Sequence, residues 1–232
     1  MKTIEINLDK RSVNQLFLPI RSKADVIVLL MNAVKQMLIN YEISDADSTG
    51  VMQLQISDMS RLSFFTEDKF FSICFPFFAK NIDDSNIEFY TKNGTIVDNK
   101  LSSEILSIVN DNKFIACQDV YEFLEPIDQV EYPSSGLWNV FIELMLFEDG
   151  YIRYDHDIER QDPIMHPLNH IDLFYNSSNT FKLGLYKKPN ANDFIDILDK
   201  TTPCHYLHQH SVGFYNSIID KIFSPRTKQR IH

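Results

Sequence analysis

Residues 136–186 read GLWNVFIELMLFEDGYIRYDHDIERQDPIMHPLNHIDLFYNSSNTFKLGLY, and this stretch decides the fold that we expect. Apolar side chains fill nearly both faces of residues 137–147 if that segment is extended, which predicts a strand covered on both sides. The sequence Glu-Asp-Gly at 148–150 predicts a tight turn, and 168–175 and 181–185 predict two more strands. We therefore expect an antiparallel meander here.

The alternation of side chains along these strands groups ionisable residues on one face of the sheet. If the turn at 148–150 closes symmetrically, Glu143 lies opposite Asp155 and shares its face with Arg153. The apolar side of the next strand, formed by Ile171 and its neighbours, leaves His170 on the polar side. The expected polar face therefore consists of Glu143, Arg153, Asp155, His170 and Asp172.

This combination of side chains suits acid–base chemistry on a phosphodiester. His170, oriented by Asp155 or Asp172, has the properties of a general base. Arg153 can stabilise negative charge that develops on phosphate, and His166 lies close enough in sequence to assist. The predicted catalytic residues are therefore His170, Arg153, Asp155 and His166.

Two other interpretations of the same residues remain open. The network can be structural, holding neighbouring strands together through hydrogen bonds. Glu143, Asp155 and Asp172 with a histidine can also bind a divalent metal such as Mg²⁺, Mn²⁺ or Zn²⁺. No fixed motif demands a metal, so we favour a metal-free mechanism with no cofactor. The segment 204–210, which contains Cys204 and His208, is a weaker metal candidate because it has no second matching pair.

Patterns in the rest of the chain predict several helices and strands. Expected strands are 3–8, 51–56, 61–65, 69–78, 86–90 and 95–97, with a turn at Asn93-Gly94. Expected helices are 26–41, which Asp25 would cap, and 102–110, 190–198 and 212–223. Residues 114–124 are ambiguous and predict a strand followed by a turn.

We expect an α+β fold with a mostly antiparallel, curved sheet covered by helices on one face. Residues 1–125 form an N-terminal α+β subdomain, 126–135 a linker, and 136–232 a C-terminal β-meander with two covering helices. The alternative is that the N-terminal strands belong to the same sheet as the meander.

Composition narrows the class of protein. The net charge of −10 across 232 residues excludes a wholly basic nucleic-acid-binding surface, so any contact with nucleic acid must be local. Three scattered cysteines form no disulfide framework, which favours a reducing, cytoplasmic setting. No signal segment or membrane span is expected.

The series Arg153-Tyr154-Asp155, His166-Pro167 and His170 resembles the RYD…HPxxH signature of an uncharacterised bacterial family. It is also distantly similar to TumE-type toxins of toxin–antitoxin systems. The resemblance covers roughly 137–208, including the apolar strand 181–185 and the helix with Phe194 and Ile195. It implies a role in bacterial defence or growth control.

Two functional hypotheses follow. The first is a cytoplasmic defence or toxin-like protein that acts as a nuclease through the His/Arg/Asp patch. The second is a non-enzymatic binding subunit that recruits a catalytic partner protein in a defence complex. Both hypotheses expect a protein partner encoded in the same operon and no membrane association; the first also expects contact with nucleic acid.

Overall fold

The computed structural model describes residues 2–39, 42–56, 60–81, 87–112, 114, 125–130, 133–173 and 181–199. The chain divides into two compact units, Met1–Gly184 and Leu185–His232. The expected features at 115–124, 204–210 and 212–223 lie outside the described residues.

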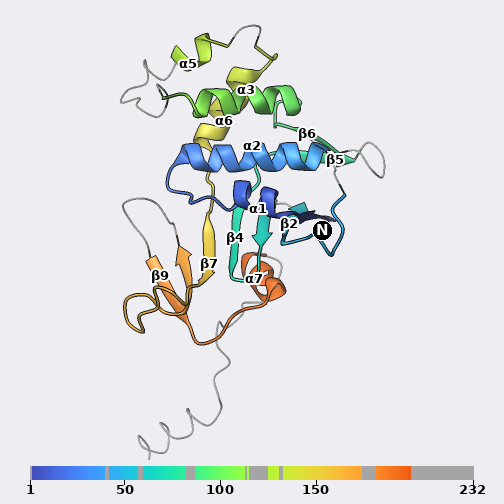
Figure 1. The fold of residues 1–232 in the computed structure, drawn as a ribbon. Helices are drawn as coiled ribbons and strands as arrows, with labels where there is room; N and C mark the ends of the chain where they lie inside the picture. The colour runs from blue at the N-terminus through green and yellow to red at the C-terminus, as the bar shows by residue number, and fades with distance from the viewer. Residues whose placement is uncertain are drawn as a thin grey trace, which may run out of the picture. The chain divides into compact units, whose positions relative to one another are not determined.

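A seven-stranded sheet in the order β1-β2-β3-β4-β7-β8-β9 carries the fold (Figure 1). All pairs from β1 to β8 are antiparallel and the sheet is open, so the predicted α+β class is confirmed. The strands are β1 (Lys2–Leu8), β2 (Gly50–Ile56), β3 (Arg61–Phe65), β4 (Lys69–Cys74), β7 (Ile152–His156), β8 (Asn169–Leu173) and β9 (Phe181–Leu185). Because β4 pairs with β7, one sheet includes strands from both sides of the predicted linker.

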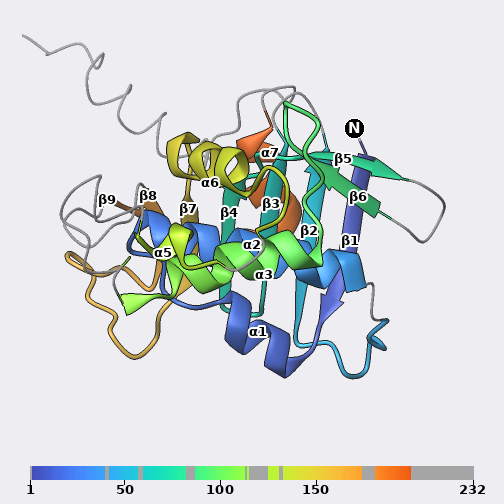
Figure 2. The same ribbon diagram turned by 90° about the horizontal axis from the view of Figure 1, so that it is seen from above.

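Helices cover one face of this sheet within the first unit (Figures 1 and 2). They are α1 (Lys10–Leu16), α2 (Lys23–Ile39), α3 (Asn99–Val109), α5 (Glu125–Asp128) and α6 (Leu137–Leu146). Leu30 and Val34 of α2 are fully buried in one apolar cluster with Phe64 of β3 and Phe71 of β4. Among the described helices, none combines the length and apolar character that crossing a membrane requires.

The start of α2 differs slightly from the prediction. Asp25 does not precede the helix but lies in its first turn, and its carboxylate accepts hydrogen bonds from the backbone N–H groups of Arg21 and Ser22. Ser22 Oγ in turn accepts a hydrogen bond from the Asp25 N–H. This reciprocal pair is a capping box, so the residue that caps α2 is Ser22.

The most consequential wrong prediction concerns residues 137–147, which form helix α6 rather than a covered strand. Leu137, Val140, Phe141 and Leu144 are buried, and their spacing is that of one face of a helix. Gly136 precedes the helix with a φ of 86°, in the left-handed region that favours glycine. The predicted hairpin around 148–150 therefore does not exist, and β7 pairs with β4 instead.

The predicted strand 69–78 is interrupted. Pro76, which has no N–H to donate, lies between β4 and a separate two-stranded sheet of β5 (Phe78–Asn81) and β6 (Ile87–Tyr90). The Asn93-Gly94 turn is confirmed: the chain reverses after β6, and Gly94 has a φ of 79°. Ile96 then forms a bridge with Tyr90.

The described part of the second unit contains helix α7 (Ala191–Leu198), as expected. Asn190 caps it, because its side chain accepts a hydrogen bond from the Asp193 N–H at 2.8 Å. The Asp193 carboxylate accepts the N–H of Asn190 in return, which completes a capping box.

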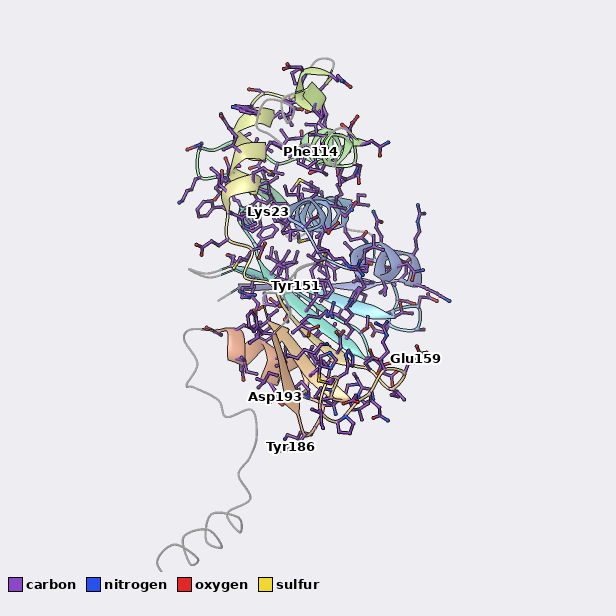
Figure 3. The ribbon with its side chains drawn as sticks, turned by 90° about the vertical axis from the view of Figure 1, so that its left-hand side faces the viewer. Lys23, Phe114, Tyr151, Glu159, Tyr186 and Asp193 are labelled. Carbon is purple, nitrogen blue, oxygen red and sulfur yellow. The ribbon has the colours of Figure 1, made fainter. Side chains whose placement is uncertain are left out.

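The side-chain view in Figure 3 places Tyr151 inside the first unit, whereas Glu159 lies on an outer loop. The rings of Phe64 and Phe71 stack at 4.5 Å, and Tyr151 lies 6.1 Å from Phe71. Aromatic contacts therefore link the core of the sheet to the beginning of β7.

Replacing Phe64 by alanine tests this core. Phe64 is fully buried, so we expect Phe64→Ala to lower the free energy of unfolding by about 3–5 kcal/mol in a urea titration. The matched change Phe181→Ala, at an exposed position, should cost less than about 1 kcal/mol. Equal losses for the two variants would show that Phe64 does not lie in the core.

Candidate functional site

Two neighbouring strands bring the predicted polar residues together. In the register of β7 with β8, Arg153 is directly opposite Asp172, and Asp155 is directly opposite His170. Directly opposed residues of an antiparallel pair share a face, and residues two apart in one strand do too. All four side chains therefore lie on one face, as the alternation in the sequence predicted.

The cluster continues the apolar core rather than the outer surface. Phe71 of β4 is opposite Arg153, and Phe64 of β3 is opposite Phe71. A row of stacked aromatic rings thus ends in a guanidinium and a carboxylate. The cluster is built on strands held rigidly by the core, which fixes the positions of its side chains.

Arg153 joins the two carboxylates. Its Nε lies 2.6 Å from Oδ2 of Asp155, and its NH2 nitrogen lies 2.5 Å from Oδ2 of Asp172. Burial by itself lowers the pKa of Arg153, but Asp155, Tyr151 and Asp172 outweigh burial and raise that pKa. Arg153 is therefore a permanent cation that contacts both acidic side chains.

His170 is held in one tautomer. Its Nδ1 lies 2.8 Å from the carbonyl oxygen of Pro167, which can only accept, so Nδ1 carries the proton. Its Nε2 lies 3.1 Å from Nζ of Lys182, which can only donate, so Nε2 presents a lone pair. Burial lowers the pKa of His170, and Lys182 lowers it further, against opposing effects of Pro167, Asp172 and Asp155. The ring is thus a neutral base that is oriented by a backbone carbonyl, whereas we expected Asp155 or Asp172 to orient it.

Lys182 is a member of the cluster that the sequence patterns did not predict. Besides its contact with His170, its Nζ lies 3.3 Å from Oδ1 of Asp172. The signal in the sequence is modest: Lys182 is the one charged residue in the predicted apolar strand 181–185. Its contribution depends on the pairing of β9 with β8, which alternation within a strand does not reveal.

His166 adjoins the cluster from the loop before β8. Its ring is 4.5 Å from that of His170 in an edge-to-face arrangement. Its Nε2 lies 3.1 Å from Oδ2 of Asp157, and its backbone forms a bridge with Asp162. His166 is therefore close to the predicted base but has its own carboxylate partner.

Glu143 does not belong to the cluster. It lies in helix α6, so the expected pairing with Asp155 across a hairpin is wrong. The strand that does lie beside β7 supplies Lys69, which is opposite Asp155. Lys69 Nζ donates to the carbonyl of Phe17 at 3.3 Å.

Exposure differs sharply within the cluster. The side chains of His170 and Asp172 are 1% and 0% exposed, whereas those of Arg153, Asp155 and Lys182 are 13%, 19% and 25% exposed. A ligand would therefore meet Lys182 and Asp155 first.

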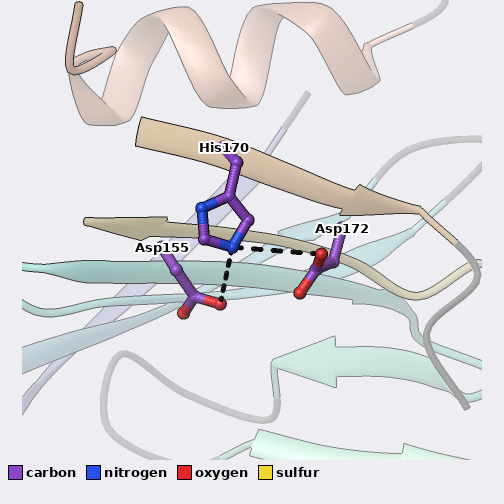
Figure 4. A group of neighbouring side chains, drawn as sticks. All are labelled: Asp155, His170 and Asp172. Carbon is purple, nitrogen blue, oxygen red and sulfur yellow. Dashed lines mark ion pairs between the residues drawn. The ribbon is translucent and has the colours of Figure 1, made fainter. Parts of the chain in front are cut away.

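Three side chains of the cluster have the chemistry of metal ligands. Asp155, His170 and Asp172 each direct one ligand atom to a common region, and these atoms lie within 4.8 Å of one another (Figure 4). Nε2 of His170 is 3.8 Å from Oδ2 of Asp155 and 4.0 Å from Oδ1 of Asp172.

Comparisons of the chain with models of protein families, with curated proteins and with solved structures find no match. What the cluster can do chemically is therefore inferred from contacts within the chain, and the likeness to the RYD…HPxxH family stays a prediction.

The structural role of Arg153 can be measured directly. Arg153→Met leaves the buried Asp172 carboxylate without its guanidinium, so we expect the free energy of unfolding at pH 7 to fall by about 3–5 kcal/mol. The control Arg160→Met also removes an arginine beside an aspartate, but Arg160 is exposed and 3.8 Å from Asp157. It should change stability by less than about 1 kcal/mol. Equal effects would contradict the assignment of Arg153 as the organiser of the cluster.

Proposed function

We propose that this protein is a defence or toxin-like nuclease that cleaves phosphodiesters at the cluster around His170. The observation that supports this best is the neutral imidazole of His170, whose Nε2 lone pair lies beside the ammonium of Lys182. A base next to a partly exposed cation suits this reaction, because the base can activate the attacking hydroxyl or water while the cation binds the anionic phosphate.

Lys182 is the group that meets the substrate in this proposal. Its ammonium moves from His170 to a phosphate oxygen, which neutralises charge on phosphate and frees Nε2 in the same step. Nε2 then takes the proton from the attacking hydroxyl or water, whose oxygen forms the new bond to phosphorus. The bond from phosphorus to the leaving oxygen breaks, and that oxygen takes up a proton, a step in which His166 would assist.

In this proposal Arg153 does not bind the phosphate, although the sequence patterns predicted that it would stabilise negative charge there. Because it is paired with Asp155 and Asp172, it stabilises the carboxylates and the cluster as a whole rather than the phosphate. Its positive charge nevertheless lies beside the reacting groups and favours the negative charge that develops on phosphate.

This mechanism uses the side-chain cations Lys182 and Arg153 where many phosphodiester reactions use a metal. With both aspartates ionised, two negative and two positive charges balance in the cluster. We therefore propose that cleavage needs no added metal ion. The same carboxylates and imidazole could instead serve as ligands of a divalent ion.

The base is tested with His170→Asn, because the asparagine amide can still donate to the Pro167 carbonyl but offers no lone pair in place of Nε2. We expect cleavage of labelled RNA or DNA to fall by about 10²–10⁴-fold. The growth inhibition caused by expressing the parent should be relieved to the same degree. His156→Asn is the control, because His156 lies in β7 on the opposite face and contacts Asn169. Undiminished cleavage in His170→Asn, or no cleavage by the parent of any RNA or DNA tested, would refute the proposal.

A second function, binding a partner protein in a defence complex, is supported by a separate observation. Large apolar side chains are exposed on the loop between β7 and β8 and on β9, namely Ile158, Ile164, Met165, Phe181 and Leu183. Exposed apolar groups of this kind are typical of protein interfaces. This function does not require the cluster to be catalytic.

The partner hypothesis predicts a stable complex with the product of a neighbouring gene. Replacing Ile164 and Met165 by serine should weaken that complex at least tenfold in a binding titration. The replacements should leave the melting temperature nearly unchanged, because both side chains are exposed. A complex that forms equally well with both serines in place would show that this loop is not the contact.

A further inference from the structure

We infer that Asp155, His170 and Asp172 form a binding site for a dication such as Zn²⁺ or Mn²⁺, and that the ammonium of Lys182 competes with this ion for the same space. The binding itself stands on geometry alone. Its effect on cleavage rests on the function proposed above, because the ion would occupy Nε2 of the proposed base.

The protonation state of His170 is already that of a metal ligand. A histidine binds a metal through a neutral ring nitrogen, and its other nitrogen commonly donates to a carbonyl or carboxylate. Here Nδ1 donates to the Pro167 carbonyl at 2.8 Å, and Nε2 faces both aspartates. No tautomer change or ring flip is needed before an ion binds.

Distances between the ligand atoms are close to those that a small dication requires. Bond lengths of about 2.0–2.2 Å in a tetrahedral site place neighbouring ligand atoms about 3.4 Å apart. The observed separations from Nε2 are 3.8 Å and 4.0 Å, and all three ligand atoms lie within 4.8 Å of one another, so they must draw together by about half an ångström or more. Rotation of the carboxylate groups supplies a movement of this size.

Within the part of the chain that the structure describes, the buried carboxylate of Asp172 has a hydrogen-bond partner at only one of its two oxygens. Oδ2 of Asp172 is paired with Arg153, but Oδ1 accepts no hydrogen bond from the described residues. Its close polar contact there is the ion pair with Lys182 at 3.3 Å. An oxygen buried in this state has lone pairs available for a cation that approaches more closely than an ammonium can.

Lys182 marks the position of the ion. Its Nζ lies 3.1 Å from Nε2 of His170 and 3.3 Å from Oδ1 of Asp172, so a positive charge already occupies the space between two of the three ligands. Arg153 pairs with Oδ2 of each carboxylate, and Oδ2 of Asp155 is also the oxygen that lies 3.8 Å from Nε2 of His170. Arg153 can remain in place as an outer partner that shares this oxygen with the ion.

Charge balance prevents the Lys182 ammonium and a bound dication from occupying the cluster together. Asp155 and Asp172 carry two negative charges, and Arg153 and Lys182 carry two positive charges. Adding a dication without moving Lys182 would leave an excess of two positive charges in a largely buried cluster, with Lys69 nearby on β4. Since the side chain of Lys182 is 25% exposed, it can swing into solvent, and the excess is then one charge.

The ligand set also selects the ion. One imidazole nitrogen with two carboxylate oxygens suits Zn²⁺ and Mn²⁺, whereas Ca²⁺ and Mg²⁺ prefer sites made of oxygen alone. We therefore expect Zn²⁺ to bind more tightly than Mn²⁺, and Mg²⁺ least tightly.

The test is calorimetric titration of the full chain with ZnCl₂ after treatment with a chelator. Because 204–210 also contains cysteine and histidine, every variant carries Cys204→Ser and His208→Ala. We expect this reference chain to bind Zn²⁺ with a Kd in the micromolar range or below. Lys182→Met should bind at least tenfold more tightly, because the competing ammonium is gone. Lys92→Met, at an exposed turn, should bind as the reference chain does.

His170→Asn and Asp172→Asn should each weaken binding at least tenfold. The gain in Lys182→Met cannot arise from misfolding, which keeps the test valid even if the other two variants are unstable. The inference is overturned if the reference chain binds Zn²⁺ with a Kd above about 1 mM. It is also overturned if Lys182→Met binds no more tightly, or if folded His170→Asn binds equally well.

Cleavage is measured separately with the same chains. If the parent cleaves, saturating Zn²⁺ should inhibit it. If Zn²⁺ binds as predicted but the parent cleaves nothing, the metal site stands and the nuclease proposal fails.

Discussion

The pairing of Arg153 with Asp155 and Asp172 is the interaction on which the rest of the cluster depends. A fully buried carboxylate is tolerated only when a cation compensates for its lost hydration, and Arg153 supplies that charge from the neighbouring strand. Arg153 pairs with one oxygen of Asp172, and Lys182 contacts the other. The Lys182 ammonium also lies beside Nε2 of His170, which places a positive charge next to the proposed base.

The fold explains why these groups meet. β7 and β8 are anchored to the core because β4, which pairs with β7, carries Phe71 in the apolar cluster. The same row that begins with stacked aromatic rings ends in the ion pair, so a shift of one residue in the register of β7 would move Arg153 to the other face. The positions of the side chains in the cluster thus depend on the hydrophobic packing of the adjoining strands.

Sequence patterns predicted the fold class and the shared face of four polar residues, but not every element around them. Alternation along 152–156 and 169–173 was enough to put Arg153, Asp155, His170 and Asp172 on one face, because strand periodicity is local. The segment 137–147 was misjudged because a continuous apolar run has no period that separates a covered strand from a buried helix. Glu143 was assigned to the cluster through that error. Lys182 and the Pro167 carbonyl were missed because their contacts depend on strand order and on a loop, which the sequence does not specify.

The proposed base and the metal site both require that His170 is a neutral ring with its proton on Nδ1 and its Nε2 lone pair facing the carboxylates and Lys182. Nitrogen NMR of the ring in labelled protein at pH 7 tests this most directly, because protonated and unprotonated ring nitrogens have well-separated shifts. We expect a protonated Nδ1 and an unprotonated Nε2. A proton on Nε2 would contradict both the neutral base and the ready metal ligand, and an Nδ1 without a proton would contradict the orienting role of Pro167.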